Sequence, residues 1–309
     1  MSEPASVRPV TAVIVTYQSA KTIGRSLEAA RRCYDAHLLD VVIVDNGSSD
    51  ATGEIIGREV DWVRVVLTGK NNGFGRGCNI GFALVDSPYV IFINPDAVVE
   101  PDAIQKMLQF MEQHPTVGIV GPAIIEGDAD GVGELQVTGE RPTPAMVLRA
   151  ALPLVRYPAL THPIVPGSAP SRTGWVCGAA LMIRTDLMKR LRGFDPRFFL
   201  YWEETDVCQR AEDVGFETWA LGTAVAHHVG GASSSFDDTR IGGCIAKHYY
   251  QSRYYYMVKH HGRFAAIMAE LGEFLLLGML SLVDVVRGRG LHRLRARMQA
   301  PLFSEPERM

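Results

Sequence analysis

Residues 10–50 read VTAVIVTYQSAKTIGRSLEAARRCYDAHLLDVVIVDNGSSD, and the two structural patterns in them alternate. Val10–Val15 is an apolar, mostly β-branched run, which is typical of a strand buried in a parallel sheet. Ile23–Cys33 carries apolar residues at helical spacing, and Val41–Val44 is a second buried strand. A strand, a helix and a strand joined by short loops predict a parallel sheet with helices packed on both faces.

The same alternation continues to about residue 120. Further strands are predicted at Val63–Leu67, Tyr89–Ile93 and Val117–Val120, and further helices at 81–85 and at 102–113, where Pro101 opens the helix. We therefore expect an α/β fold with a mostly parallel sheet. Ligands of such sheets bind at the carboxyl ends of the strands. Those ends carry polar loops at 16–17, 45–46, 71–77 and 94–96.

The pattern changes after residue 125. Residues 126–172 contain seven prolines from Pro142 to Pro170 and predict a long excursion that carries binding residues. Regular patterns then return, with strands at 175–183, 218–221 and 224–226 and helices at 186–191, 203–214, 241–261 and 264–286. We expect a domain over 1–240, in halves 1–125 and 126–240, followed by a helical extension over 241–309 that ends in a basic tail.

Composition excludes several classes of protein. Thirty-one Lys and Arg against 34 Asp and Glu leave a net charge of −3, so no basic surplus indicates nucleic acid binding. With 47% hydrophobic residues the chain can bury a sizeable core. The five cysteines form no C-x-x-C pair, which favours a reducing compartment over a disulfide framework. The start of the chain shows no signal peptide, and no window reaches about 18 uncharged apolar residues, so we expect a cytoplasmic protein without a membrane span.

Two loops on the expected ligand edge suggest phosphate chemistry. Asn94-Pro95-Asp96 follows a strand, and a carboxylate held there could ligate Mg²⁺ or Mn²⁺, although these are also ordinary turn residues. The loop 71–79 reads NNGFGRGCN, and its glycines would let the backbone approach a phosphate or nucleoside closely. It could equally be a plain connection.

Two later clusters suggest acid–base and metal chemistry. Glu203, Glu204 and Asp206 lie within four residues, where like charges raise one another's pKa and suit one carboxylate to act as a general base. They could instead form an acidic helix N-terminus. His227-His228 could complete a metal site or contact a phosphate, or be structural.

The order of these motifs is more specific than any one of them. It runs Thr16-Tyr17, Asp45–Asp50, Asn71-Asn72-Gly73-Phe74-Gly75, Asn94-Pro95-Asp96, Gly193-Phe194-Asp195, Trp202–Asp206 and His227-His228. Over 10–235 this order resembles the family 2 glycosyltransferases with the GT-A fold, and most closely their rhamnosyltransferase-like branch. The resemblance implies transfer of a sugar from a nucleotide diphosphate sugar to a hydroxyl, with inversion at the anomeric carbon.

The resemblance also implies roles for residues of the first half. Positions that hold the nucleotide are matched by Thr16, Tyr17 and Asp45 at the base, by Asn71, Gly73 and Gly75 beside base and ribose, and by Asn94 at the ribose. Asp96 matches the carboxylate that binds a divalent cation, Mg²⁺ or Mn²⁺, while Asn94 replaces the first Asp of the family's D-x-D motif.

In the second half, the resemblance implies that Glu204 is the general base, with Glu203 and Asp206 as alternatives. Trp175 and Gly178 match the strand lining the acceptor side, Trp202 and Tyr201 offer flat faces to a sugar ring, and Arg210 could neutralise a diphosphate or pair with Asp206. His228, or else His227, fits the family's late His-x-x-Gly-x-Ser element together with Gly231 and Ser233, and would join the metal site.

The C-terminal segment allows several partners. A helix over 264–286 would have one polar stripe of Glu270, Glu273, Ser281 and Asp284, and five arginines follow up to Arg297. The apolar face of this helix could pack on the catalytic domain or in a homodimer. It could also make a peripheral membrane contact through 264–297 at the inner face of the plasma membrane.

The favoured function is rhamnosyl transfer from dTDP-rhamnose to a glycan or polyprenyl-linked acceptor in cell-surface polysaccharide synthesis. The alternatives are a nucleotidyltransferase and a non-catalytic nucleotide- or carbohydrate-binding protein.

Overall fold

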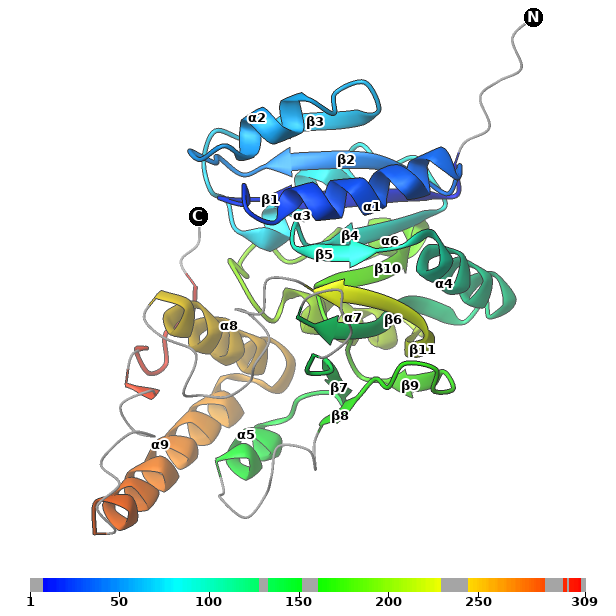
Figure 1. Ribbon diagram of the computed structural model, residues 1–309. Helices are drawn as coiled ribbons and strands as arrows, with labels where there is room; N and C mark the ends of the chain where they lie inside the picture. The colour runs from blue at the N-terminus through cyan, green and yellow to red at the C-terminus, as the bar shows by residue number, and fades with distance from the viewer. Residues whose placement is uncertain are drawn as a thin grey trace, which may run out of the picture.

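The protein is seen in a computed structural model that describes residues 8–127, 133–151, 161–228, 244–286, 297–298 and 300–306 (Figure 1). In the first half, the strands are β1 (Val10–Thr16), β2 (Leu39–Asp45), β3 (Val63–Leu67), β4 (Tyr89–Ile93), β5 (Ala97–Val99) and β6 (Val117–Glu126). The helices are α1 (Ile23–Asp35), α2 (Thr52–Gly57), α3 (Phe74–Phe82) and α4 (Pro101–Gln113). The predicted strand–helix alternation is therefore confirmed.

The second half contributes short strands and longer helices. Its strands are β7 (Val137–Gly139), β8 (Thr161–Pro163), β9 (Ser171–Thr173), β10 (Ala180–Arg184) and β11 (Glu217–His228). Its helices are α5 (Pro144–Ala150), α6 (Thr185–Arg190), α7 (Glu203–Asp213), α8 (Cys244–His261) and α9 (Arg263–Val286). In α5, Pro144 occupies the first turn and the Thr143 side chain accepts a hydrogen bond from the Met146 amide, which explains where the helix begins.

The main sheet has the order β3-β2-β1-β4-β10-β6-β11-β5, with β9 paired to β11. Strands β1 to β4 are mutually parallel where they pair, whereas β10 is antiparallel to both β4 and β6. The sheet is thus mostly parallel, as predicted. Insertion of β10 brings the segment just before it, residues 175–179, to the carboxyl end of β4.

Alternate residues of the central strands form two apolar layers. Ala12 and Ile14 of β1 belong to the cluster under α1 and α4, while Val13 and Val15 belong to the cluster under α3 and α7. All four side chains are buried. Burial on both faces explains why β1 is a continuous apolar run and not an alternating one.

Several predicted boundaries need correction. The strand expected over 175–183 is only β10, and the strands expected at 218–221 and 224–226 are one strand, β11, with a register shift between Leu221 and Val225. Helix α3 begins at Phe74 and not near residue 81, so the glycine-rich segment is largely helical. The described parts of 126–172, expected to be one long loop, contain β7, α5, β8 and β9. Strand β7 pairs with β8, and β9 pairs with β11.

Helices α8 and α9 pack together beside the main sheet (Figure 1). By length and composition alone, α9 is long and apolar enough to cross a membrane, although its acidic residues leave no run of 18 uncharged positions, as predicted. In the described structure, however, one side of α9 is buried and carries Glu270 and Glu273, which bind the guanidinium groups of Arg253 and Arg297. Two carboxylates and two guanidinium groups balance in charge, as buried ionic groups must.

Candidate active site

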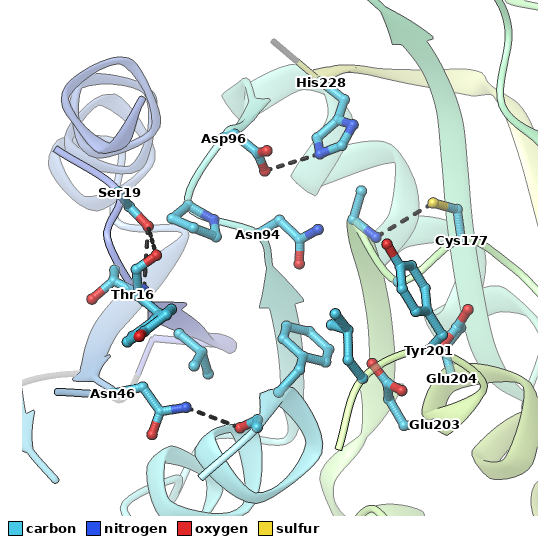
Figure 2. A pocket seen from close by; sticks show the side chains of 18 of the residues that line it. Thr16, Ser19, Asn46, Asn94, Asp96, Cys177, Tyr201, Glu203, Glu204 and His228 are labelled. Atoms are coloured by element: carbon cyan, nitrogen blue, oxygen red, sulfur yellow. Dashed lines mark hydrogen bonds and ion pairs between the residues drawn. The ribbon is translucent and has the colours of Figure 1, made fainter. Parts of the chain in front are cut away.

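A pocket of about 440 Å³ opens at the carboxyl ends of β1 and β4. Figure 2 shows Thr16, Ser19 and Asn46 on one wall of the pocket. Tyr201, Glu203 and Glu204 lie on the other wall. Four segments supply most of the lining: residues 15–19, 94–96, 175–179 and 199–204. The pocket therefore lies at the sheet edge that the sequence predicts, and residues from both halves of the chain close it.

The wall built by β1 and β2 is polar. Thr16 and Tyr17 line the pocket, and Tyr17 is half exposed. Asp45 is buried behind them, where one carboxylate oxygen accepts a hydrogen bond from Thr16 Oγ1 at 3.1 Å and both oxygens accept from the Ser48 amide at 3.3 Å. The structure thus brings Thr16 and Tyr17 to the pocket, while the contacts of Asp45 shape the loop beside it.

Asn46 organises the glycine-rich loop, a role that sequence reasoning missed. Its Nδ2 donates to Asn71 Oδ1 at 3.2 Å and to the Gly73 carbonyl at 3.0 Å, and its Oδ1 accepts from the Asn72 amide at 3.1 Å. Asn46 is buried and lines the pocket, as Asn71 and Gly73 do. The signal was present in the sequence, because Asn46 follows directly after a buried strand in a polar loop.

The glycines of this loop are required by the segment that faces it. Gly73 has φ +82°, and a Cβ there would lie 2.4 Å from the carbonyl oxygen of Phe199. The next amide, that of Phe74, donates to the same oxygen at 2.8 Å. Gly75 does not line the pocket, and a Cβ on it would lie 3.3 Å from Phe194 Cβ. These two positions join the first half of the chain to the segment that leads to Glu203 and Glu204.

Asp96 and His228 form the polar end of the pocket (Figure 2). His228 Nε2 lies 2.9 Å from Asp96 Oδ1, and its Nδ1 lies 2.9 Å from Glu126 Oε1. Burial opposes protonation of the imidazole, but the two carboxylates raise the pKa of His228 to about 9. Asn94 lines the pocket beside them. Glu126, a further residue that sequence reasoning missed, fixes the orientation of the His228 ring.

Of the two histidines, only His228 belongs to this site. They are adjacent on β11, where successive side chains point to opposite faces, so His227 is directed away from Asp96. His227 does not line the pocket, whereas His228 does.

The residues present fit a divalent cation that shares a diphosphate. Carboxylate oxygens and waters suit Mg²⁺ and Mn²⁺, and such ions in transferases are held by one or two protein ligands together with substrate phosphates. Asp96 and His228 offer such a pair at the pocket once the imidazole has lost the proton that its two carboxylate neighbours favour. No cluster of three or more His, Cys, Asp or Glu side chains able to hold a metal exists among the described residues. A cation here would need the substrate to complete its coordination.

Glu203 and Glu204 begin α7 and reach the pocket from the side opposite β1 (Figure 2). Burial raises the pKa of Glu204 to about 7. Burial, and secondly the charge of Glu204, raise the pKa of Glu203 well above its usual range. Near neutral pH, Glu203 is therefore the protonated member of the pair and Glu204 is the one that can accept a proton.

The segment before α7 is conformationally unusual. Tyr201 and Trp202 both have positive φ, at 68° and 73°, in the left-handed region that side chains other than glycine rarely adopt. Tyr201 lines the pocket, but Trp202 does not. Trp175 and Gly178 complete this wall, and a Cβ on Gly178 would lie 3.6 Å from Glu204 Cδ. A Cβ at Gly178 would thus be in ordinary van der Waals contact with the glutamate.

The structure does not bring Asp206 or Arg210 to the pocket. Asp206 is fully buried, and Arg210 Nε donates to its Oδ2 at 2.7 Å. Burial opposes ionisation of Asp206, but a hydrogen bond from His260 and the charges of Arg210 and Lys259 lower its pKa. A carboxylate with a lowered pKa and no access to the pocket is a poor base. The remaining guanidinium contacts of Arg210 go to the carbonyls of residues 191 and 193, not towards a diphosphate site.

Comparison with known proteins agrees with this site. A family model described as "Glycosyl transferase family 2" matches residues 11–169. The chain is 28% identical to the N-acetylglucosaminyl-diphospho-decaprenol L-rhamnosyltransferase of Mycobacterium tuberculosis over 245 residues, covering 72% of this chain and 76% of that protein. It is 22% identical to the rhamnosyltransferase WbbL of Escherichia coli over 156 residues, or 48% of this chain and 58% of that one.

Among solved structures, the fold is similar to that of the mannosyltransferase PcManGT from Pyrobaculum calidifontis in complex with GDP-Man and Mn²⁺. The TM-score is 0.54 at 16% identity, and the match covers 96% of this chain and 88% of that chain. This likeness confirms the GT-A fold that the order of motifs implied.

Proposed function

The chain belongs to glycosyl transferase family 2, and from this premise we propose that it transfers rhamnose from dTDP-rhamnose to a lipid-linked sugar in cell-surface glycan synthesis. One observation carries the proposal. Asp96 and His228 occupy one end of the pocket, and Glu204, whose pKa is about 7, lines the same pocket from another element. A group for the diphosphate and a base for the acceptor thus share one cavity.

In the proposed reaction, the nucleotide lies against Thr16, Tyr17 and the loop held by Asn46. Asp96 and His228 would hold a divalent cation, which when bound stabilises the charge that develops on the departing diphosphate. Glu204 accepts the proton of the acceptor hydroxyl. The oxygen then bonds to the anomeric carbon as the bond to the diphosphate breaks. A single displacement from the opposite face inverts that carbon.

The choice of donor and acceptor rests on the named relatives. Two of them are rhamnosyltransferases, and the mycobacterial one is named for an N-acetylglucosaminyl-diphospho-decaprenol acceptor. In this chain, the wall of Trp175, Tyr201 and Gly178 beside Glu204 is where we place the acceptor sugar. Trp175 and Tyr201 have flat apolar faces suited to a sugar ring.

The experiment that tests the proposal is a donor screen scored by release of nucleotide diphosphate. It compares dTDP-rhamnose, UDP-GlcNAc and GDP-mannose, each with Mn²⁺ and with and without a polyprenyl-diphosphate-linked GlcNAc acceptor. We expect acceptor-dependent release of dTDP from dTDP-rhamnose. Release from another donor alone would reject the rhamnosyl assignment, and binding of nucleotides without any turnover would favour a non-catalytic binding protein.

We also propose that the protein is cytoplasmic and contacts the membrane through α9. The exposed side of this helix is a single apolar stripe, here called the α9 stripe, formed by Phe264, Met268, Leu271, Leu275, Met279, Leu282 and Val286. Arg287, Arg289, Arg293 and Arg295 follow in sequence without an acidic residue between them, outside the described residues. Basic residues next to an apolar stripe favour an anionic lipid surface. Arg297 is excluded from this role, because it is buried against Glu270.

Vesicle flotation tests the membrane contact. We expect the full chain to float with vesicles containing anionic lipid, and a variant with Phe264, Leu275 and Met279 all changed to Gln to stay behind. Equal flotation of both proteins would reject the contact. Light scattering without lipid would detect a homodimer formed through the same stripe, and a dimer lost in this variant would replace lipid by a second copy as its partner.

A further inference from the structure

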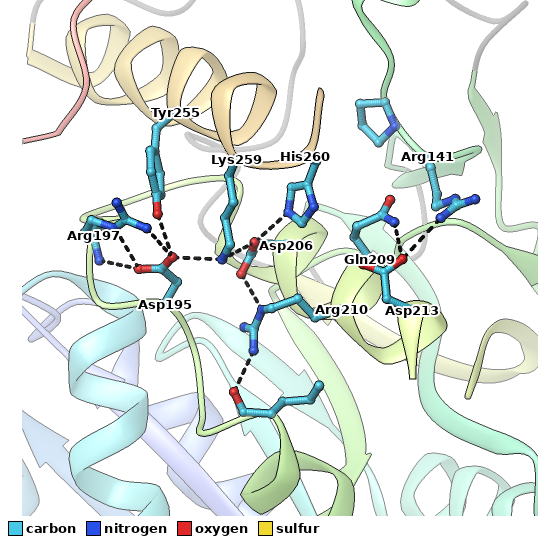
Figure 3. Close-up of polar contacts among 12 residues, drawn as sticks. Arg141, Asp195, Arg197, Asp206, Gln209, Arg210, Asp213, Tyr255, Lys259 and His260 are labelled. Carbon is cyan, nitrogen blue, oxygen red and sulfur yellow. Dashed lines mark hydrogen bonds and ion pairs between the residues drawn. The ribbon is translucent and has the colours of Figure 1, made fainter. Parts of the chain in front are cut away.

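Asp206 connects helices α7 and α8, which are far apart in the sequence (Figure 3). Its Oδ1 lies 2.6 Å from Lys259 Nζ and 2.8 Å from His260 Nε2, both at the end of α8. Its Oδ2 accepts from Arg210 one turn further along α7. The carboxylate is fully buried, so water does not weaken these contacts as it would on the surface.

Lys259 and Asp195 extend the network to the loop before α7. Lys259 Nζ lies 2.8 Å from Asp195 Oδ2, and the Tyr255 hydroxyl donates to the same oxygen at 2.8 Å. Figure 3 shows Lys259 between the two aspartates, with α8 lying above α7. One lysine of the C-terminal helix thus holds both the start of α7 and the loop that leads to it.

The position of Asp206 on α7 relates it to Glu204. Residues of an α-helix advance by about 100° each, so Asp206 lies about 200° around the helix from Glu204. The two carboxylates therefore occupy nearly opposite sides of α7. Contacts that hold Asp206 against α8 turn the other side of the helix, with Glu204, towards the pocket.

Helix α8 also supports the strained segment before α7. Ser252 Oγ donates to the Leu200 carbonyl at 3.0 Å, and the Trp202 ring packs against the Tyr256 ring with centroids 5.1 Å apart. Tyr201 and Trp202 have positive φ, a strained conformation that persists only where the surrounding structure holds it. Helix α8 is the element that supplies these contacts.

We infer that α8 is a positioning element of the active site, and that Lys259 and His260, acting through Asp206, orient α7 so that Glu204 faces the pocket. The inference rests on the proposed role of Glu204 as the base. It makes Asp206 a positioning residue, and it makes the C-terminal helices part of the catalytic unit although the sequence suggested an extension from residue 241. Misplacement of a catalytic group by about 1 Å can cost about 100-fold in rate.

The test compares Lys259→Met, Lys259→Arg and Ser252→Ala in the full chain. We expect Lys259→Met to lower kcat about tenfold or more, while KM for dTDP-rhamnose and the Kd of dTDP stay within about twofold, because the nucleotide wall is untouched. Lys259→Arg should restore most of kcat, since a guanidinium can still contact both aspartates. Ser252→Ala removes only one hydroxyl and should lower kcat about threefold.

Arg184→Met is the matched control for loss of stability. Arg184 donates to the carbonyls of Val117 and Met111 at the end of β10 away from the pocket, so its loss weakens the fold without touching α7. We expect this variant to lose thermal stability and keep kcat.

Three results would overturn the inference. The first is a folded Lys259→Met protein with unchanged kcat. The second is a fall in kcat that Arg184→Met matches at an equal loss of Tm. If Lys259→Met does not fold, the third is an unchanged kcat in Ser252→Ala. Normal turnover by Glu204→Gln would instead reject the proposed base itself, so the two failures are distinguishable.

Discussion

Replacement of Glu204 by Gln tests the proposed chemistry most directly. The amide has nearly the same size as the carboxylate and cannot accept the proton of the acceptor hydroxyl. Loss of a general base typically costs about 10² to 10⁴ in rate, which corresponds to about 2.7–5.5 kcal/mol of transition-state stabilisation. We therefore expect kcat to fall by that factor, with the Kd of dTDP unchanged.

The pH profile gives the same prediction a second measurement. Because the pKa of Glu204 is about 7, about one tenth of the carboxyl is ionised at pH 6 and about nine tenths at pH 8. The proton must be absent for the base to work, so kcat/KM should rise about tenfold from pH 6 to pH 8 in the wild type. The residual activity of Glu204→Gln should lack this rise.

The adjacent Glu203 is the matched control. Its pKa is raised well above the usual range, so it is already neutral near pH 7 and an amide resembles it. Glu203→Gln should retain the pH rise and most of kcat. The assignment would be refuted by near-normal turnover in Glu204→Gln, or by loss of the pH rise in Glu203→Gln alone.

Three further predictions concern the metal, the nucleotide loop and the C-terminal helices. Glu126→Ala should weaken Mn²⁺ binding in the presence of dTDP by about 10- to 100-fold, measured by paramagnetic resonance of free Mn²⁺, because Glu126 orients the imidazole that we propose to bind the metal. Gly73→Ala should weaken dTDP binding about tenfold or more, since its Cβ would lie 2.4 Å from the carbonyl oxygen of Phe199. The control Gly69→Ala also has a positive φ, but no atom lies within 4 Å of its Cβ, so it should change dTDP binding little. Arg297→Met should lower the free energy of unfolding by about 3–5 kcal/mol in a urea titration, because it leaves two buried carboxylates with only the guanidinium of Arg253 to balance them. Removal of the exposed guanidinium in Arg263→Ala should cost about 1 kcal/mol or less.

The strands and the ligand edge could be predicted because their signals are local. The run Val10–Val15 carries apolar side chains on both faces of the strand. The polar residues after each strand follow directly in sequence. Thr16, Asn71, Asn94 and Asp96 do line one pocket, as their places at strand ends required.

Other features of the site could not have been predicted from local patterns. Glu203, Glu204 and Asp206 form one acidic run in the sequence, yet Glu203 and Glu204 reach the pocket and Asp206 is buried against α8. Glu126 is 102 residues from His228 and carries no motif of its own. What distinguishes these carboxylates is which charges and how much water surround each one, and both depend on elements far away in the chain.

The sequence by itself thus determined the order of strands and motifs, the family and the set of candidate groups, because these follow from the residue types and their spacing. The tertiary structure alone decided which of these groups lie together at the pocket. It selected His228 over His227 by the alternation of β11, and it separated Glu204 from Asp206 by the rotation of α7. It also joined α8 to the active site through Lys259, since only folding places that cation beside two aspartates more than fifty residues earlier in the chain.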